Sequence, residues 1–270
     1  MKILISNDDG IAAQGIKALV TNLAPEHDVY VVAPDRERSA AGHSLTLHSP
    51  IRVEEIEPQF GAKKMWVTNG TPGDCVKIGI CALLKQEELP NIVISGINHG
   101  PNLGTDILYS GTVSCALEAA MLDYPSIAVS LASMTPDLVY FDSTAKFVAR
   151  LLPRIKNMEF PAKTILNINA PALEEEDVAG VEITKLGTKM FTDNYDKRID
   201  PRGKVYYWMA GELTSKHEED GTDIAAVRAN RISITPVTFE MTHKEVMNNL
   251  ENAFCSGGIC DWYGYGANNS

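Results

Sequence analysis

Polar side chains that could bind a cation follow three apolar segments of the chain. Asp8 and Asp9 come directly after the apolar segment Lys2–Ser6. Ser39 and Asn98 follow two later segments of the same kind. In an open parallel sheet, ligands bind outside the carboxyl ends of the strands, so we expect these side chains at one edge. Their oxygen atoms suit Mg²⁺, Mn²⁺ or Ca²⁺ better than zinc.

A predicted helix start in the same region is a candidate phosphate site. The helix begins at Ser110, Gly111 and Thr112. Free backbone N–H groups and the helix dipole at such a start bind anions, and an ordinary N-cap is compatible with that role. His43 and His99 are candidate acid–base or orienting groups, although a loop histidine with satisfied hydrogen bonds is the simpler interpretation of each.

Apolar periodicity predicts strands and helices in alternation. The predicted strands are Lys2–Ser6, Asp28–Ala33, Met65–Thr68, Asn91–Ile97, Ser126–Leu131, Thr164–Ile168 and Arg231–Val237. The predicted helices include Ile16–Leu23, Thr112–Met121, Thr144–Leu152 and one that begins at Thr71-Pro72, with Asp74 three residues after the cap. This alternation indicates right-handed βαβ units and a mainly parallel sheet covered on both faces, a doubly wound α/β fold.

The last third of the chain has a different pattern. A polar, aromatic segment at 191–211 contains a strong turn signal, Asp200–Gly203, and is predicted to be a protruding hairpin. Thr242 and Glu245 form a predicted capping box at the start of a C-terminal helix. We therefore expect a core at 1–187 completed by 222–240, a hairpin region at 188–221, and a helix with a Gly- and Asn-rich tail at 241–270.

The composition excludes several classes of protein. The chain has 270 residues with 24 basic and 35 acidic side chains, a formal charge of −11, which argues against a nucleic-acid backbone as partner. No apolar stretch approaches the ~18 residues of a membrane span. The apolar start is interrupted at Asn7, so we expect no signal peptide and a cytoplasmic location. The five cysteines (75, 81, 115, 255 and 260) lack metal-site spacing and are expected to be buried free thiols.

Several motifs together resemble those of the SurE (stationary-phase survival) family of metal-dependent nucleotidases. They are MKILISNDDG, VVAPDRERSAAGHSLTLH, GTPGDCV, VISGINHGPNLGTDILYSGTVSCALEAA and YYWMAGE, in the family's order over nearly all of residues 1–237. The resemblance implies a Rossmann-like core that binds one divalent cation per subunit, Mg²⁺ or Mn²⁺, through Asp8, Asp9, Ser39 and Asn98. It places phosphate binding at Ser110, Gly111 and Thr112, with Asn102 nearby. It also implies dimers that exchange a C-terminal helix, and tetramers formed through an extended hairpin.

The expected activity is hydrolysis of nucleoside 5′-monophosphates, and of 3′-nucleotides as an extension. Asp8 or Asp9 is expected to accept the proton of the attacking water, with Asp8 favoured slightly. A group that does not bind the cation stays open as the alternative base, because a carboxylate bound to a cation is a poor base. An aspartyl-phosphate mechanism fits less well, because its carboxylates are two residues apart and face the same side, whereas adjacent ones diverge. Polyphosphate trimming in the same site and a non-catalytic nucleotide sensor stay open as alternatives. A purely structural assembly protein would leave the polar strand-end loops unexplained.

Overall fold

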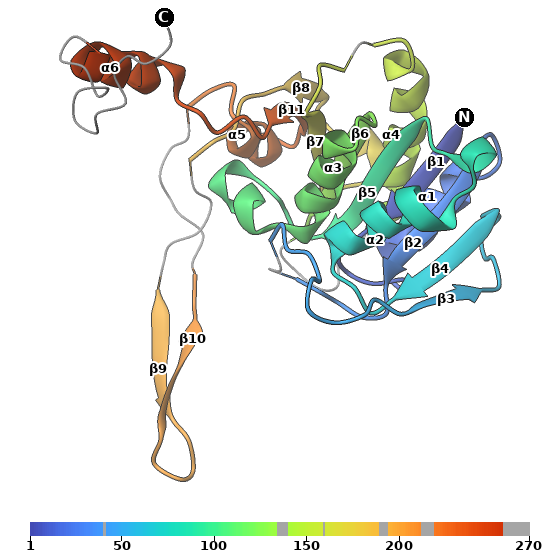
Figure 1. The fold of residues 1–270 in the computed structure, drawn as a ribbon, viewed down its shortest axis with the longest axis horizontal. Coiled ribbons are helices and arrows are strands. Elements are labelled where there is room, and N and C mark those ends of the chain that lie inside the picture. The colour runs from blue at the N-terminus through green and yellow to red at the C-terminus, as the bar shows by residue number, and fades with distance from the viewer. Residues whose placement is uncertain (40–41, 134–139, 159, 189–193, 212–218, 256–270) are drawn as a thin grey trace, which may run out of the picture. The chain divides into compact units, whose positions relative to one another are not determined.

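The structure is a computed structural model that describes residues 1–39, 42–133, 140–158, 160–188, 194–211 and 219–255. Its centre is a nine-stranded sheet in the order β3-β4-β2-β1-β5-β6-β7-β11-β8 (Figure 1). Within this sheet, as far as the structure describes it, two neighbouring pairs, β3–β4 and β7–β11, are antiparallel. The strands are β1 (Lys2–Ser6), β2 (Asp28–Pro34), β3 (Val53–Ile56), β4 (Lys64–Thr68), β5 (Ile92–His99), β6 (Ser126–Ala132), β7 (Thr164–Pro171), β8 (Val181–Ile183) and β11 (Ile232–Thr238).

Helices cover both faces of the sheet (Figure 1). Ile3 and Ile5 of β1 pack with α1 (Gln14–Leu23) and α4 (Phe141–Ile155), whereas Leu4 packs with α2 (Pro72–Ile78) and α3 (Gly111–Met121), because successive strand side chains point to opposite faces. No helix in the described ranges is long and apolar enough to cross a membrane. The helices are α1 (Gln14–Leu23), α2 (Pro72–Ile78), α3 (Gly111–Met121), α4 (Phe141–Ile155), α5 (Asp223–Arg228) and α6 (Lys244–Cys255), with the shorter helical turns η1 (Gly79–Leu83), η2 (Gln86–Glu88), η3 (Gly104–Tyr109) and η4 (Glu175–Asp177).

The predicted doubly wound, mainly parallel α/β fold is confirmed. All seven predicted strands occur, with boundaries that move by at most a few residues. The predicted start of α2 is also correct, because Thr71 and Asp74 form both hydrogen bonds of a capping box and Pro72 is the first helical residue. The sequence interpretation missed β3, β8 and α5, which are the short elements of the fold.

Two regions of the chain are not part of the central sheet. Strands β9 (Tyr195–Ile199) and β10 (Val205–Met209) form the predicted antiparallel hairpin (Figure 1). All ten strand residues are exposed. Residues 191–193 of the predicted hairpin lie outside the described residues. A second compact unit begins at Phe239 and contains α6. The predicted capping box at Thr242 is wrong by one residue, because the backbone N–H of Val246 donates to Nδ1 of His243.

The cysteine prediction is only partly correct. Cys75 and Cys115 are buried free thiols, and burial raises the pKa of Cys75 to about 12. Cys81 is a free thiol but is exposed, because it lies on the outer side of the short turn η1. The side chain of Cys255, and Cys260, fall outside the described part of the chain.

Because α1 packs closely on β5, replacement of a glycine in this helix by alanine is expected to destabilise the protein. A Cβ at Gly15 would lie 1.9 Å from the carbonyl oxygen of Ile97. Alanine is favoured over glycine inside a helix by ~1 kcal/mol, but relieving this clash requires a backbone shift. We expect Gly15→Ala to lower the free energy of unfolding by about 2 kcal/mol in urea denaturation. Gly73→Ala in α2, where the nearest atoms are 3.4 Å away, is the matched control and should be neutral or stabilising.

Candidate metal and phosphate site

A tight turn at the end of β1 presents the two aspartates. The buried side chain of Asn7 donates from Nδ2 to the carbonyl of Gly10 (3.0 Å) and accepts the N–H of Gly10 at Oδ1 (3.1 Å). Gly10 has a φ of 100°, and a Cβ there would lie 3.1 Å from the carbonyl carbon of Arg36. The turn therefore needs glycine at this position, and it fixes where Asp8 and Asp9 point.

Asp8 lies directly against the start of α3. The hydroxyl of Thr112 donates to Oδ1 of Asp8, and both side chains are buried. A Cβ at Gly111 would be 2.6 Å from the Cβ of Asp8, so only glycine permits this approach. Ser110 is the N-cap, and its Oγ accepts the N–H of Val113 (3.1 Å). The structure thus brings the first predicted carboxylate and the predicted phosphate segment together.

Asp9 contacts the end of β5 next to Asn98 in the chain. Oδ2 of Asp9 accepts the backbone N–H of His99 at 3.1 Å. The side chain of Asn98, next in the chain, donates from Nδ2 to the carbonyl of Gly100 at 2.9 Å. This hydrogen bond uses the amide nitrogen of Asn98 and leaves its side-chain oxygen to accept or to bind a cation.

The loop after β2 brings Ser39 and a third carboxylate, Glu37. The N–H of Arg38 donates to the carbonyl of Asp8 (2.7 Å), which ties this loop to the turn after β1. The exposed hydroxyl of Ser39 donates to Oε1 of Glu37 at 2.7 Å. The sequence interpretation missed Glu37, although its position in the same strand-end loop as Ser39 was an available signal.

The electrostatics of the site favour a bound cation. Burial raises the pKa of Asp8, and burial followed by the charge of Asp8 raises the pKa of Asp9 to about 7. The charge of Glu37 acts in the same direction on both groups. The described residues contain no cluster of three His, Cys, Asp or Glu side chains arranged to hold a metal. A cation here would therefore depend on the oxygens of Ser39 and Asn98 as well as the two aspartates, a set that suits a hard divalent ion.

Asn102 has a different environment from the other predicted phosphate ligands. It is buried, and its Nδ2 donates to Oγ of Ser130 (2.7 Å). Its backbone N–H donates to Oδ1 of Asn169 (2.8 Å), and its carbonyl accepts from Nδ2 of Asn167 and Nδ2 of Asn169 (2.9 Å each). These side chains on β6 and β7 fix the loop between Asn98 and α3. The alternating Asn residues of the LNINAP segment are the sequence signal for this network, which the sequence interpretation missed.

His43 and Asp223 hold the loops around the site. His43 Nε2 lies 2.8 Å from Oε2 of Glu118 on α3, and Lys77 Nζ of α2 lies 2.6 Å from Oε1. These contacts, led by that of His43, lower the pKa of the buried Glu118. His43 is thus an orienting group that ties the loop after β2 to α3. Asp223 of α5 accepts the N–H groups of Gly104 (2.8 Å) and Gly187 (2.7 Å) and anchors η3.

A cavity of about 270 Å³ opens beside Asp9. The ring of His99 packs edge-on against that of Phe141, with centroids 6.1 Å apart. The cavity is lined by Asp9, Ala13, Gln14, Gly15, Glu37, His99 and Phe141. It provides space next to the carboxylates with both polar and aromatic walls.

These features define a Rossmann-like α/β protein with an acidic strand-end site that faces the N-terminus of a helix. A family model described as Survival protein SurE matches residues 3–193, and the chain belongs to the SurE family. Proteins named 5′-nucleotidase SurE from Thermosynechococcus vestitus and Pelotomaculum thermopropionicum are 50% and 49% identical to it. Each comparison covers 93% of this chain, and 95% and 94% of the respective relatives. The crystal structure of the SurE protein from Aquifex aeolicus superposes with a TM-score of 0.81 at 40% identity, covering 93% of this chain and 98% of that one.

The raised pKa of Asp9 predicts a pH-dependent cost to stability. The folded protein retains the Asp9 proton up to about pH 7, whereas the unfolded chain loses it near 3.8, so stability falls as pH rises between these values. Asp9→Asn removes the charge that causes this loss. In EDTA at about pH 8.5 we expect the variant to melt at least ~3 °C above the unsubstituted protein, with a much smaller difference near pH 4.5. Lower melting temperatures at both pH values would contradict the explanation.

Proposed function

We propose that the protein is a divalent-metal-dependent phosphatase that hydrolyses nucleoside monophosphates, 5′-nucleotides first and 3′-nucleotides as an extension. The observation that carries the proposal is the contact of Asp8 with Thr112 at the start of α3, while the neighbouring Asp9 accepts the N–H of His99, next to Asn98 at the end of β5. The relatives that this chain matches over nearly their whole length are named 5′-nucleotidase SurE, and these names support the same activity.

Four side chains are proposed to hold one Mg²⁺ or Mn²⁺ per subunit: Asp8, Asp9, Ser39 and Asn98. When bound, the cation polarises a phosphoryl oxygen and lowers the pKa of a bound water. Thr112 orients the Asp8 carboxylate through Oδ1 and leaves Oδ2 to bind the cation or accept a proton. Asp8 or Asp9 is proposed to accept the proton of the attacking water.

The phosphate is proposed to bind at Ser110, Gly111 and Thr112. The first N–H groups of a helix have no acceptor within the helix, and Ser110 satisfies only that of Val113. The N–H of Gly111 and the dipole of α3 are therefore left to offset charge on the transferred group. Asn102, whose side chain is bound to Ser130, is proposed to act by fixing the loop at this edge.

The hairpin and α6 support a homodimer or homotetramer. An isolated two-stranded hairpin is marginally stable in water, yet β9 and β10 expose Tyr195, Tyr207 and Trp208 by 60% or more. In α6, Val246 and Leu250 are about half exposed (46% and 51%). We propose that 188–221 and 241–270 make subunit contacts, and that 1–187 with 222–240 is the catalytic core, acting in the cytoplasm.

Phosphate release from a panel of nucleoside monophosphates tests the activity. We expect release with Mn²⁺ or Mg²⁺, loss in EDTA, and recovery when the metal is restored. Asp9→Asn is the matched inactive control and should retain under about 1% of the turnover, since it removes a charged ligand. Nucleotide binding without phosphate release under any metal would instead identify a sensor, and inorganic polyphosphate in the panel would reveal chain trimming.

The hydrogen bond from Thr112 to Asp8 predicts a second, graded effect. Thr112→Val keeps the size of the side chain but removes the donor, so the Asp8 carboxylate loses its orientation. We expect kcat to fall by about 10- to 100-fold. Thr112→Ser, which keeps the hydroxyl, should stay within about threefold of the unsubstituted protein. Equal activity of the valine and serine variants would show that this contact has no role in turnover.

A further inference from the structure

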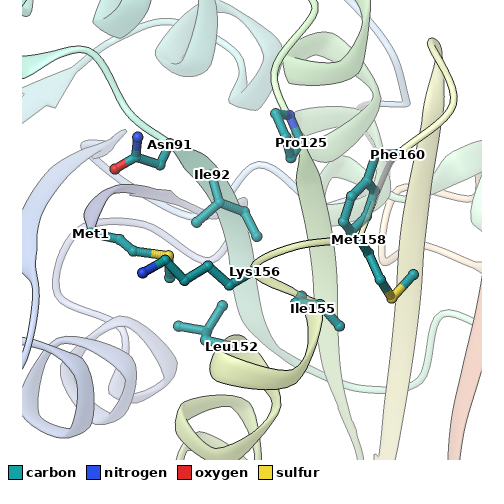
Figure 2. A pocket seen from close by; sticks show the side chains of 9 residues that line it. All are labelled: Met1, Asn91, Ile92, Pro125, Leu152, Ile155, Lys156, Met158 and Phe160. Carbon is teal, nitrogen blue, oxygen red and sulfur yellow. The ribbon is translucent and has the colours of Figure 1, made fainter.

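A larger cavity, of about 440 Å³, lies at the opposite end of the strands from the acidic site, where β1, β5 and β6 begin. Figure 2 shows its walls, which come from the starts of β1, β5 and β6 and from the end of α4 with the segment that follows it. The lining residues are Met1, Asn91, Ile92, Pro125, Leu152, Ile155, Lys156, Met158 and Phe160. The volume falls within the range of ~300–1,000 Å³ that is typical of small-molecule sites.

This cavity is separate from the acidic site. Ile92 is the first residue of β5 and lines the cavity, whereas Asn98 lies near the opposite end of the same strand. At ~3.3 Å per residue, the strand separates the two by roughly 20 Å. A molecule bound at this edge therefore has no contact with Asp8, Asp9 or the start of α3.

The floor of the cavity is apolar. Ile92, Leu152 and Ile155 are at least nine-tenths buried and form part of the main hydrophobic core. Phe160 adds an aromatic ring, and the thioether of Met158 lies at the side, where the residue is 52% exposed (Figure 2). An aliphatic floor with an aromatic ring and an adaptable methionine is suited to an apolar ligand body.

The rim carries positive charge in a chain whose net charge is −11. Figure 2 shows the side chain of Lys156 extending along the cavity toward Met1. The amino group of Met1 lies 3.4 Å from Nδ1 of His27, and the pKa of His27 is lowered by burial and then by the charges of this amino group and of Lys156. Within the described ranges, no carboxylate forms an ion pair with Lys156.

We propose that this cavity is a binding site for a small amphipathic organic anion, with its apolar body against Leu152, Ile155 and Phe160 and its acidic group at Lys156. The apolar floor provides burial, and the rim provides a charge that is complementary to an acid and repels an amine. The inference does not depend on the proposed nucleotidase activity, because neither the cation site nor the phosphate site takes part.

Binding of 8-anilinonaphthalene-1-sulfonate to the full-length protein tests the proposal, by calorimetry and fluorescence without nucleotide or metal. We expect one site per subunit that Lys156→Glu weakens by at least about tenfold. Arg154→Glu is the matched control, since Arg154 is an exposed cation in the last turn of α4, two residues before Lys156, that does not line the cavity. It should change the affinity by less than about twofold.

Two further measurements separate this site from other apolar surfaces, including the hairpin. Phe160→Ala, once its melting curve shows that it is folded, should weaken the same binding event by removing the ring. Octanoate should displace the probe at a concentration about tenfold below that of octylammonium, which has the same chain and the opposite charge. Absence of the site, or equal binding by Lys156→Glu and Arg154→Glu, would overturn the proposal. Turnover of Lys156→Glu should match the unsubstituted protein, so the two proposals fail independently.

Discussion

The contact between the Asp8 carboxylate and the first turn of α3 is the constraint on which the rest of the site depends. It requires glycine at 111, because any Cβ would occupy the space of the Asp8 side chain. Glu118 lies on the same helix, α3, and contacts His43 of the loop after β2 and Lys77 of α2. The loop after β2 is thereby held to α3. The turn after β1 and the loop after β2, which are far apart from α3 in the sequence, are therefore both connected to this one helix.

The same contact concentrates negative charge in a chain that is already acidic. Burial, with a smaller contribution from the charge of Glu37, raises the pKa of Asp8 and of Asp9, and the charge of Asp8 adds to the rise at Asp9. Backbone and hydroxyl donors offset only part of this, through Thr112 and the N–H of His99. Such an arrangement lowers the stability of the folded protein. A charged cluster that is kept despite this cost is usually functional rather than structural. Exchange of either aspartate is therefore expected to impair function rather than folding.

Local patterns predicted the parts of the molecule that local chemistry determines. The buried strands β1, β2 and β5 are apolar runs, and the capping box at Thr71 depends on residues three apart. Strand β3 was missed because two of its four residues, Glu54 and Glu55, are exposed acids. Around Asn102, Ser130 of β6 accepts from the side chain and Asn169 of β7 donates to the carbonyl, and the alternating Asn residues of β7 do not by themselves indicate which distant loop they contact.

The position of the last strand has a consequence for synthesis of the chain. Strands β4, β2 and β1 are complete by residue 68 and are neighbours, so this half of the sheet can assemble early. Strand β8 lies at the opposite edge and pairs with β11, which leaves the ribosome only after the hairpin β9–β10. Because domains begin to fold while they are translated, β7 presents an unpaired edge throughout that interval. The nascent chain is therefore most exposed to misassociation between the synthesis of β7 and that of β11, and a chaperone that acts on this protein during translation has most to shield in that interval.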